Sequence, residues 1–179
     1  ISIIQKPPFK LSKDEIEEIR NFKISMENAV KVDFSDINFE NEEAGDLQKT
    51  VVKIAICAEE YGITLKPQMC QAYVADVYEK ALGVRGHAES AVMAGRVWSV
   101  SEDWKTIQVG AAVYGNSNCI YGHVGIYIGG GKVAHNINGK VIIQPLDSFI
   151  NQYNCKCWGW ENGQNLTGKE EYNCVGGMI

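Results

Sequence analysis

The sequence predicts an α+β domain in which a cysteine-bearing helix packs on an antiparallel sheet of about five strands. Helical periodicity dominates the residues before about 100, and from Val109 glycines become frequent and the pattern turns to alternation. Helices followed by strands, instead of alternating with them, are typical of α+β folds. The length of 179 residues suits one domain with an appendage.

Residues 1–45 are expected to form a helical arm or linker ahead of a domain at 46–179. Ser12 and Glu15 have capping-box spacing, which predicts a helix over about 13–29. Residues 31–46 are rich in acidic side chains and predict a solvated loop. This acidic stretch separates the first helix from the later elements, and the domain boundary is placed at its end.

Three helices are expected within the domain. One follows Asp46 and ends near Gly62, where glycine suits a C-terminal cap. A second opens around Pro67, carries Cys70 in its first turn and ends at Leu82, and a short third covers about 88–98. The positive end of a helix dipole favours thiolate over thiol, so Cys70 is a candidate nucleophile. A single cysteine is often a small apolar filler, and catalysis requires a histidine nearby.

Glycine-bounded stretches of alternating residues predict the strands of the sheet, with a single helical turn between the last two. Each stretch is short, and several are rich in β-branched residues, as strands are. The expected strands cover 109–114, 122–128, 132–136, 140–144 and 155–160, and the helical turn covers 146–150.

The glycines at 129–131 predict a three-residue hairpin turn, since such turns commonly place glycine at positive φ. In that register His135 lies opposite Gly125, and His123 lies diagonally next to His135 on the same face. The two backbones would then be roughly 7–8 Å apart, with the missing side chain of Gly125 leaving room between the rings. A two-residue loop would instead send His135 to the other face.

Cys70, His123 and His135 together supply the parts of a thiol acyl-transfer site: a nucleophile, a base and a polar group that orients the base. The chain order of cysteine, histidine and polar residue is that of papain-like enzymes. Asn136 is the second candidate for the orienting role, although alternation directs it to the opposite face. Taken separately, each histidine is as well explained by an ordinary structural role.

Residues 122–135 resemble the histidine hairpin of NlpC-type cell-wall peptidases. Residues 69–76 resemble the cysteine helix of these enzymes and of their CHAP relatives, and residues 109–114 resemble the preceding strand. The resemblance covers about 60–165. It implies a papain-like fold with Cys70 as nucleophile, His123 as general base and His135 as orienting residue.

Two stretches depart from the NlpC pattern. The Asp-Cys-Ser triplet is replaced by Met69-Cys70-Gln71, and the Tyr-Gly-Gly lead-in is replaced by the sequence that begins at Tyr61. A tyrosine at that place contributes to substrate binding and the oxyanion site in the family. The resemblance therefore makes Tyr61 a substrate-binding candidate, and we expect Gln71 and Tyr127 to join it.

The resemblance implies hydrolysis of an amide bond in a peptidoglycan stem peptide by a Cys-His-His mechanism, without a metal or organic cofactor. Such an enzyme acts on the cell wall, either secreted or phage-delivered, and we expect it to be a monomer. An N-acetylmuramoyl-L-alanine amidase or another thiol acyl transferase would use the same groups. A non-catalytic wall-binding module of a phage or mobile element is the alternative outside enzymes, with Trp98, Trp104, Trp158 and Trp160 as sugar contacts.

Composition narrows the alternatives further. The formal net charge is −5, so no general basic field would hold nucleic acid. No apolar run reaches the roughly 20 residues of a membrane span. The six cysteines do not form the pattern of a small disulfide scaffold, and we expect mostly reduced thiols. Cys155, Cys157 and Cys174 lack the usual spacing of zinc ligands.

Overall fold

The computed structural model describes residues 13, 42–116 and 120–179. Within this part of the chain, three helices precede most of the sheet, as the sequence predicts. They are α2 (Asp46–Ile56), α3 (Cys70–Leu82) and α4 (Ala91–Trp98). The helix expected over about 13–29 lies outside the described residues, and the division at residue 45 stays a prediction.

The described residues form a six-stranded sheet in which every neighbouring pair is antiparallel, with the order β1-β6-β2-β3-β4-β5. The α+β class is therefore confirmed, and each of the five expected strands is present. The additional strand, β1, is only three residues long and pairs at the edge with β6. The strands are β1 (Ser99–Ser101), β2 (Ala112–Gly115), β3 (His123–Gly129), β4 (Lys132–Ile137), β5 (Lys140–Pro145) and β6 (Cys155–Gly159).

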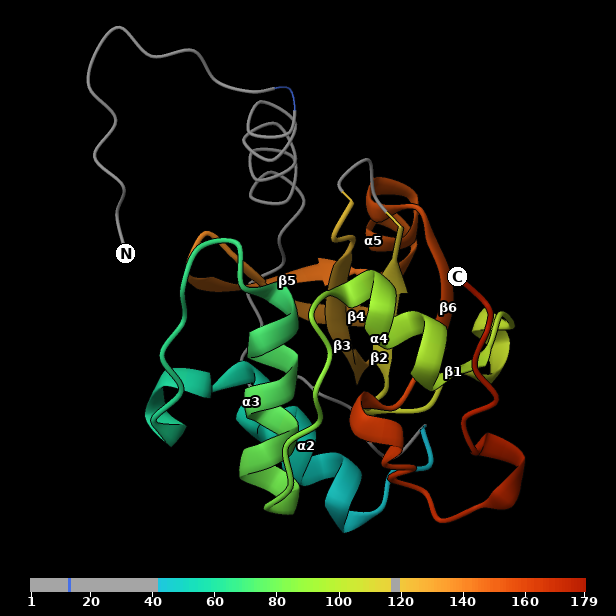
Figure 1. The fold of residues 1–179 in the computed structure, drawn as a ribbon. Helices are drawn as coiled ribbons and strands as arrows, with labels where there is room; N and C mark the ends of the chain where they lie inside the picture. The colour runs from blue at the N-terminus through green and yellow to red at the C-terminus, as the bar shows by residue number, and fades with distance from the viewer. Residues whose placement is uncertain (1–12, 14–41, 117–119) are drawn as a thin grey trace, which may run out of the picture.

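Helices α2 and α3 pack against β3 and β4, and α4 packs against β2 (Figure 1). A fourth helix, α5 (Leu146–Tyr153), connects β5 to β6 in place of the single turn expected there. Every residue of β3 is buried, so the central strand is covered on both faces. No helix in the described ranges is long and apolar enough to cross a membrane.

The β3–β4 hairpin has the register that the sequence predicts. Ile126 pairs with Ala134 and Tyr127 pairs with Val133, so the same register brings Gly125 opposite His135. The three turn glycines, residues 129–131, have φ values of 87°, 60° and 72°, in the left-handed region that favours glycine. The loop between the strands has two residues, Gly130 and Gly131, instead of the three expected. A register shift between Tyr127 and Gly129 restores the predicted pairing at the histidine positions.

Helix α3 begins later than expected. Its first residue is Cys70 and its N-cap is Met69, whereas Pro67 lies in a turn before the helix. Gln68 has a φ of 61°, a left-handed conformation that cannot continue a right-handed helix. The prediction that the helix opens at Pro67 is therefore wrong, and Cys70 lies at the very start of the helix.

Candidate functional site

Cys70 is the first residue of α3, and its side chain is half-buried and not in a disulfide. The first backbone N–H groups of a helix have no acceptor within the helix, and their partial positive charge favours a nearby anion. Since α3 packs against β3 and β4, the helix that carries Cys70 lies on the strands that carry the two predicted histidines. The sequence alone does not determine that these elements are neighbours, and the fold brings them into contact.

His123 and His135 meet directly. Their Nε2 and Nδ1 atoms lie 2.9 Å apart, a hydrogen-bond distance, and the rings are nearly perpendicular at 85°. His123 is 8% exposed and His135 is fully buried. Gly125 makes this approach possible, because a Cβ atom there would lie 3.1 Å from the Cβ of His135 and 2.5 Å from Val133 Cγ1.

Aromatic rings from α5 cover the histidine pair. Tyr153 stacks on His123 with ring centroids 4.1 Å apart, and Phe149 contacts both imidazoles at 5.7 and 4.9 Å. This apolar surrounding penalises a charged ring, so burial lowers the pKa of His123 to about 3. His123 is therefore neutral at pH 7 and is able to accept a proton.

The pKa of His135 is also well below its ordinary value, first because of burial and then because of the neighbouring His123. The nearby Gln144 side chain acts in the opposite direction and raises the pKa of His135. Both imidazoles are thus held neutral, and each has one protonated and one unprotonated ring nitrogen.

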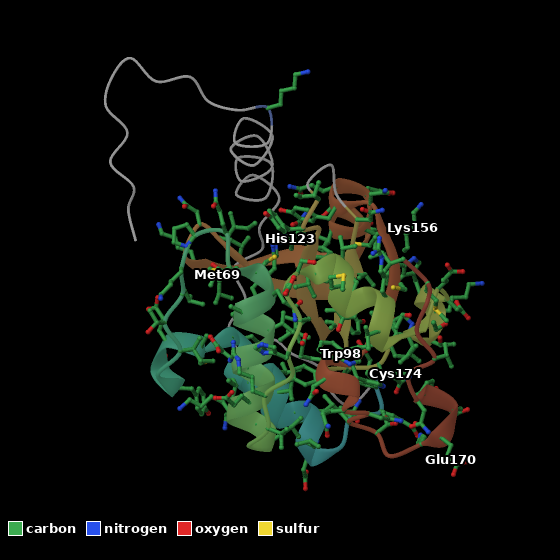
Figure 2. The ribbon with its side chains drawn as sticks, viewed as in Figure 1. Met69, Trp98, His123, Lys156, Glu170 and Cys174 are labelled. Carbon is green, nitrogen blue, oxygen red and sulfur yellow. The ribbon has the colours of Figure 1, made fainter. Side chains whose placement is uncertain are left out.

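Asn136 has a different role from the orienting one considered for it. Its side-chain nitrogen donates to the carbonyl oxygens of Lys66 at 2.8 Å and Met69 at 3.4 Å. The side chain therefore ties β4 to the segment that leads into Cys70. Figure 2 shows Met69 and His123 on the same side of the molecule, near the start of α3.

The three expected substrate-binding residues have different surroundings. Tyr61 is 37% exposed at the end of the short helix η2 (Ala58–Tyr61). Gln71 is buried, and the hydroxyl of Tyr127 accepts from the N–H of Gly131 at 3.1 Å and donates to Glu42 at 3.3 Å. Contact between these residues and a substrate stays a prediction, for which Tyr61 is the most accessible.

Glu161 is a buried carboxylate that the sequence analysis did not single out. It follows β6, is fully buried, and accepts hydrogen bonds from Gln71 Nε2 at 2.7 and 2.9 Å. Burial raises its pKa to about 7, although the Gln71 hydrogen bond and the charge of Arg85 act in the opposite direction. No periodicity marks such a residue, because its burial depends on the return of the chain to the first turn of α3.

A groove of about 390 Å³ adjoins the start of α3. Its lining includes the polar or charged side chains of Lys66, Lys80, Arg85 and Asn136, together with Met69. Arg85 forms ion pairs with Asp76 and Glu79 in the same lining. The lining reaches Met69, the residue before Cys70, but it includes neither Cys70 nor the two histidines.

Two of the four tryptophans considered for sugar contact belong to the core, since Trp158 and Trp160 are fully buried. Their indole N–H groups donate to backbone oxygens of Asp103 at 3.1 Å and Tyr172 at 2.7 Å. The described residues contain no group of three or more metal-ligating side chains arranged to hold an ion.

Solved structures of NlpC proteins resemble this fold. NlpC1 from Trichomonas vaginalis is 18% identical with a TM-score of 0.50, and the match covers 67% of this chain and 45% of that one. NlpC2 from the same organism is 18% identical with a TM-score of 0.50, over 73% and 50% of the two chains. A NlpC/P60 family protein from Bacillus cereus ATCC 10987 matches at 17% identity and a TM-score of 0.47, over 72% and 43%. The chain thus spans about half the length of these structures.

The search of curated proteins finds no match to this chain. The NlpC/P60 family model matches residues 60–159, which is more than half of the chain and includes Cys70, His123 and His135. Members of the family are typically cysteine peptidases of the cell-wall endopeptidase type, in agreement with the resemblance of the hairpin and the cysteine helix. The extent of the match shows that the chain belongs to the NlpC/P60 family.

Proposed function

We propose that the protein is a thiol hydrolase that cleaves an amide bond in a peptidoglycan stem peptide at the cell wall. The observation that carries the proposal is the buried, hydrogen-bonded pair of His123 and His135 on strands that contact the cysteine helix. Family membership supports the same reaction class. In this proposal, part of the peptide lies in the groove beside Met69.

In the proposed reaction, the Cys70 sulfur attacks the amide carbonyl while His123 accepts the thiol proton. The imidazole is neutral at pH 7 and therefore has an unprotonated ring nitrogen that can take the proton. The developing oxyanion accepts a hydrogen bond from the backbone N–H of Cys70 at the helix start. His123 then returns the proton to the leaving amine, and water hydrolyses the thioester with His123 as base.

His135 acts through His123 by holding its ring in one orientation and one tautomer. The hydrogen bond of 2.9 Å between the rings supports this role. Loss of such an orienting partner impairs a nucleophile–base pair without removing either group. We therefore expect a His135→Ala variant to retain weak activity, and a Cys70→Ala variant to retain none.

Digestion of purified peptidoglycan sacculi tests the proposal. Wild-type protein should release fragments that mass spectrometry identifies as products of stem-peptide cleavage, and Cys70→Ser should release none, since a hydroxyl is a far weaker nucleophile than a thiolate. Full release by Cys70→Ala would contradict the thiol mechanism. Products cut between muramic acid and L-alanine would identify an amidase, and binding to sacculi without any product would identify a wall-binding module.

A further inference from the structure

We propose that Gln144 is a positioning residue that fixes the tautomer of His135, and through it the tautomer of His123. The inference rests on the proposed function for its catalytic consequence, but its structural part stands on the geometry of the sheet. It extends the cysteine–histidine–histidine arrangement by one residue on the next strand, β5.

The pairing of the strands sets the three side chains in a diagonal row. His123 is two residues from Gly125, the residue opposite His135 in the observed register. On the other side of β4, His135 pairs with Ile142, and Gln144 is two residues further along β5. Residues separated in this way share one face of the sheet and lie within reach of long side chains. The row crosses β3, β4 and β5 in equal steps.

Two buried atoms in this row are complementary as hydrogen-bond donor and acceptor. His135 Nε2 and Gln144 Oε1 are both buried, and neither has a hydrogen-bond partner among the residues that the structure describes. Gln144 itself is fully buried. A protonated ring nitrogen requires an acceptor, and an unpaired buried amide oxygen requires a donor. Gln144 also raises the pKa of His135, against the effect of burial, which is the direction expected if its oxygen accepts from the protonated ring.

The nitrogen of the Gln144 amide is already in use. It donates to Gln152 Oε1 at 2.8 Å and to Ser148 Oγ at 3.2 Å, which leaves the amide oxygen as the group available to accept. Gln152 in turn donates to the hydroxyl of Tyr153 at 3.1 Å, and Tyr153 stacks on His123. The orientation of Gln144 is thus set by α5, the helix that covers the histidine pair.

This arrangement determines where the protons lie. With Gln144 Oε1 as acceptor, His135 carries its proton on Nε2, and its Nδ1 is left to accept from His123 Nε2 across the 2.9 Å contact. His123 then has an unprotonated Nδ1. That nitrogen is the one that would accept the thiol proton of Cys70 in the proposed reaction.

Nitrogen-15 NMR of histidine-labelled wild-type protein at pH 7 measures these tautomers directly. The chain has three histidines, and a His87→Gln variant assigns the third. We expect both His123 and His135 to be protonated on Nε2 and unprotonated on Nδ1. Protonation of His135 on Nδ1 would overturn the inference, and this result does not depend on whether the protein hydrolyses peptidoglycan.

Two substitutions of Gln144 test its role in catalysis. Gln144→Met removes the acceptor at similar volume, and we expect loss of the single tautomer. By analogy with the hydrogen-bond partners of metal-ligating histidines, kcat on soluble peptidoglycan fragments should fall about 10- to 100-fold with KM unchanged. Gln144→Glu retains an acceptor oxygen and should restore both the tautomer and most of kcat. A Gln144→Met protein with the wild-type tautomer and kcat would contradict the proposal.

Ser148→Ala is the matched control, because it removes a partner of the Gln144 nitrogen and leaves the amide oxygen in place. We expect the tautomers and kcat to remain those of the wild type. If the wild-type protein releases no fragments at all, the proposed function fails, while the NMR spectra still decide the role of Gln144. If Gln144→Met does not fold, the wild-type spectrum and Gln144→Glu carry the test.

Discussion

At the scale of single residues, Glu161 is the carboxylate, among those that the structure describes, whose pKa is raised by burial. It is fully buried, and Gln71 donates to both of its oxygens from the first turn of α3. The amide oxygen of Gln71 has no hydrogen-bond partner among the described residues. The pair of Gln71 and Glu161 therefore joins the cysteine helix to the segment after β6. The Glu161 carboxylate, when charged, and the Gln71 amide oxygen both lack sufficient hydrogen-bond donors.

A Glu161→Gln variant should lose a pH dependence that the wild type has. The folded pKa of about 7 lies above the ordinary 4.5, so between these values the folded chain holds one proton more than the unfolded chain. Unfolding free energy therefore falls as pH rises through this window. The neutral amide avoids this loss and also supplies a donor to the free oxygen of Gln71, which should stabilise the protein by about 2–3 kcal/mol at pH 8.

Urea unfolding of both proteins at pH 4.5, 6 and 8 measures the effect as a difference, which removes contributions that the two share. The stability difference should be small at pH 4.5 and grow toward pH 8. A constant difference across the three pH values would show that Glu161 does not titrate in this window. The activity of Glu161→Gln on sacculi reports separately on whether the pair positions the cysteine helix.

At the scale of elements, the β3–β4 hairpin determines whether the two imidazoles meet. Its register follows from three consecutive glycines with positive φ, and its packing follows from one further glycine, Gly125. A shift by a single residue would direct His135 to the opposite face. The hairpin is therefore the element whose local sequence most directly specifies the candidate site.

We expect Gly125→Ala to be destabilising. The added Cβ would lie 2.5 Å from Val133 Cγ1 and 2.9 Å from the backbone oxygen of Ala134, and the backbone atom cannot move aside easily. Overpacking of this kind costs about 1–3 kcal/mol. Urea unfolding should show this loss, and the inter-ring hydrogen bond should weaken as β4 is displaced.

Gly130→Ala is the control for Gly125→Ala, since a Cβ at Gly130 meets nothing within 4 Å and only its φ of 60° is unfavourable. This change should cost about 1 kcal/mol and leave the histidine pair intact. A smaller loss for Gly125→Ala than for Gly130→Ala would contradict the close packing at Gly125.

At the scale of the whole molecule, burial of two histidines makes folding sensitive to acid. Both have pKa values below the ordinary 6.5, so below that value the unfolded chain binds protons that the folded chain rejects. The two buried histidines therefore cost no stability above pH 6.5, and the free energy of unfolding declines as the pH falls below that value. The slope is about 1.4 kcal/mol per pH unit for each histidine.

Replacement of His135 by glutamine should reduce the loss of unfolding free energy at low pH by the contribution of one histidine. Thermal or urea unfolding between pH 6.5 and 4.5 measures the slope for wild type, His135→Gln and His87→Gln. His87 lies in an exposed loop, so its replacement should leave the slope as in the wild type. Equal slopes in all three proteins would show that the buried pair is not the source of the acid sensitivity.

The sequence predicts the α+β class, five of the strands and the hairpin register, because glycine turns and alternation are local signals. It does not predict β1, since three residues are too few for a pattern, or the later start of α3, which the left-handed Gln68 imposes. Gln144 and Glu161 could not be identified in advance, because their surroundings depend on strand pairing and on the return of the chain to α3.

The hydrogen bonds of the Asn136 side chain couple strand β4 mechanically to the turn before Cys70. It holds the backbone oxygens of Lys66 and Met69, immediately before Cys70, while its neighbour His135 binds the ring of His123. Two adjacent residues of β4 thus make these contacts: His135 is hydrogen-bonded to the imidazole of His123, and Asn136 is hydrogen-bonded to the turn that precedes Cys70. A displacement of β4 would therefore be transmitted both to the turn before Cys70 and to the ring of His123.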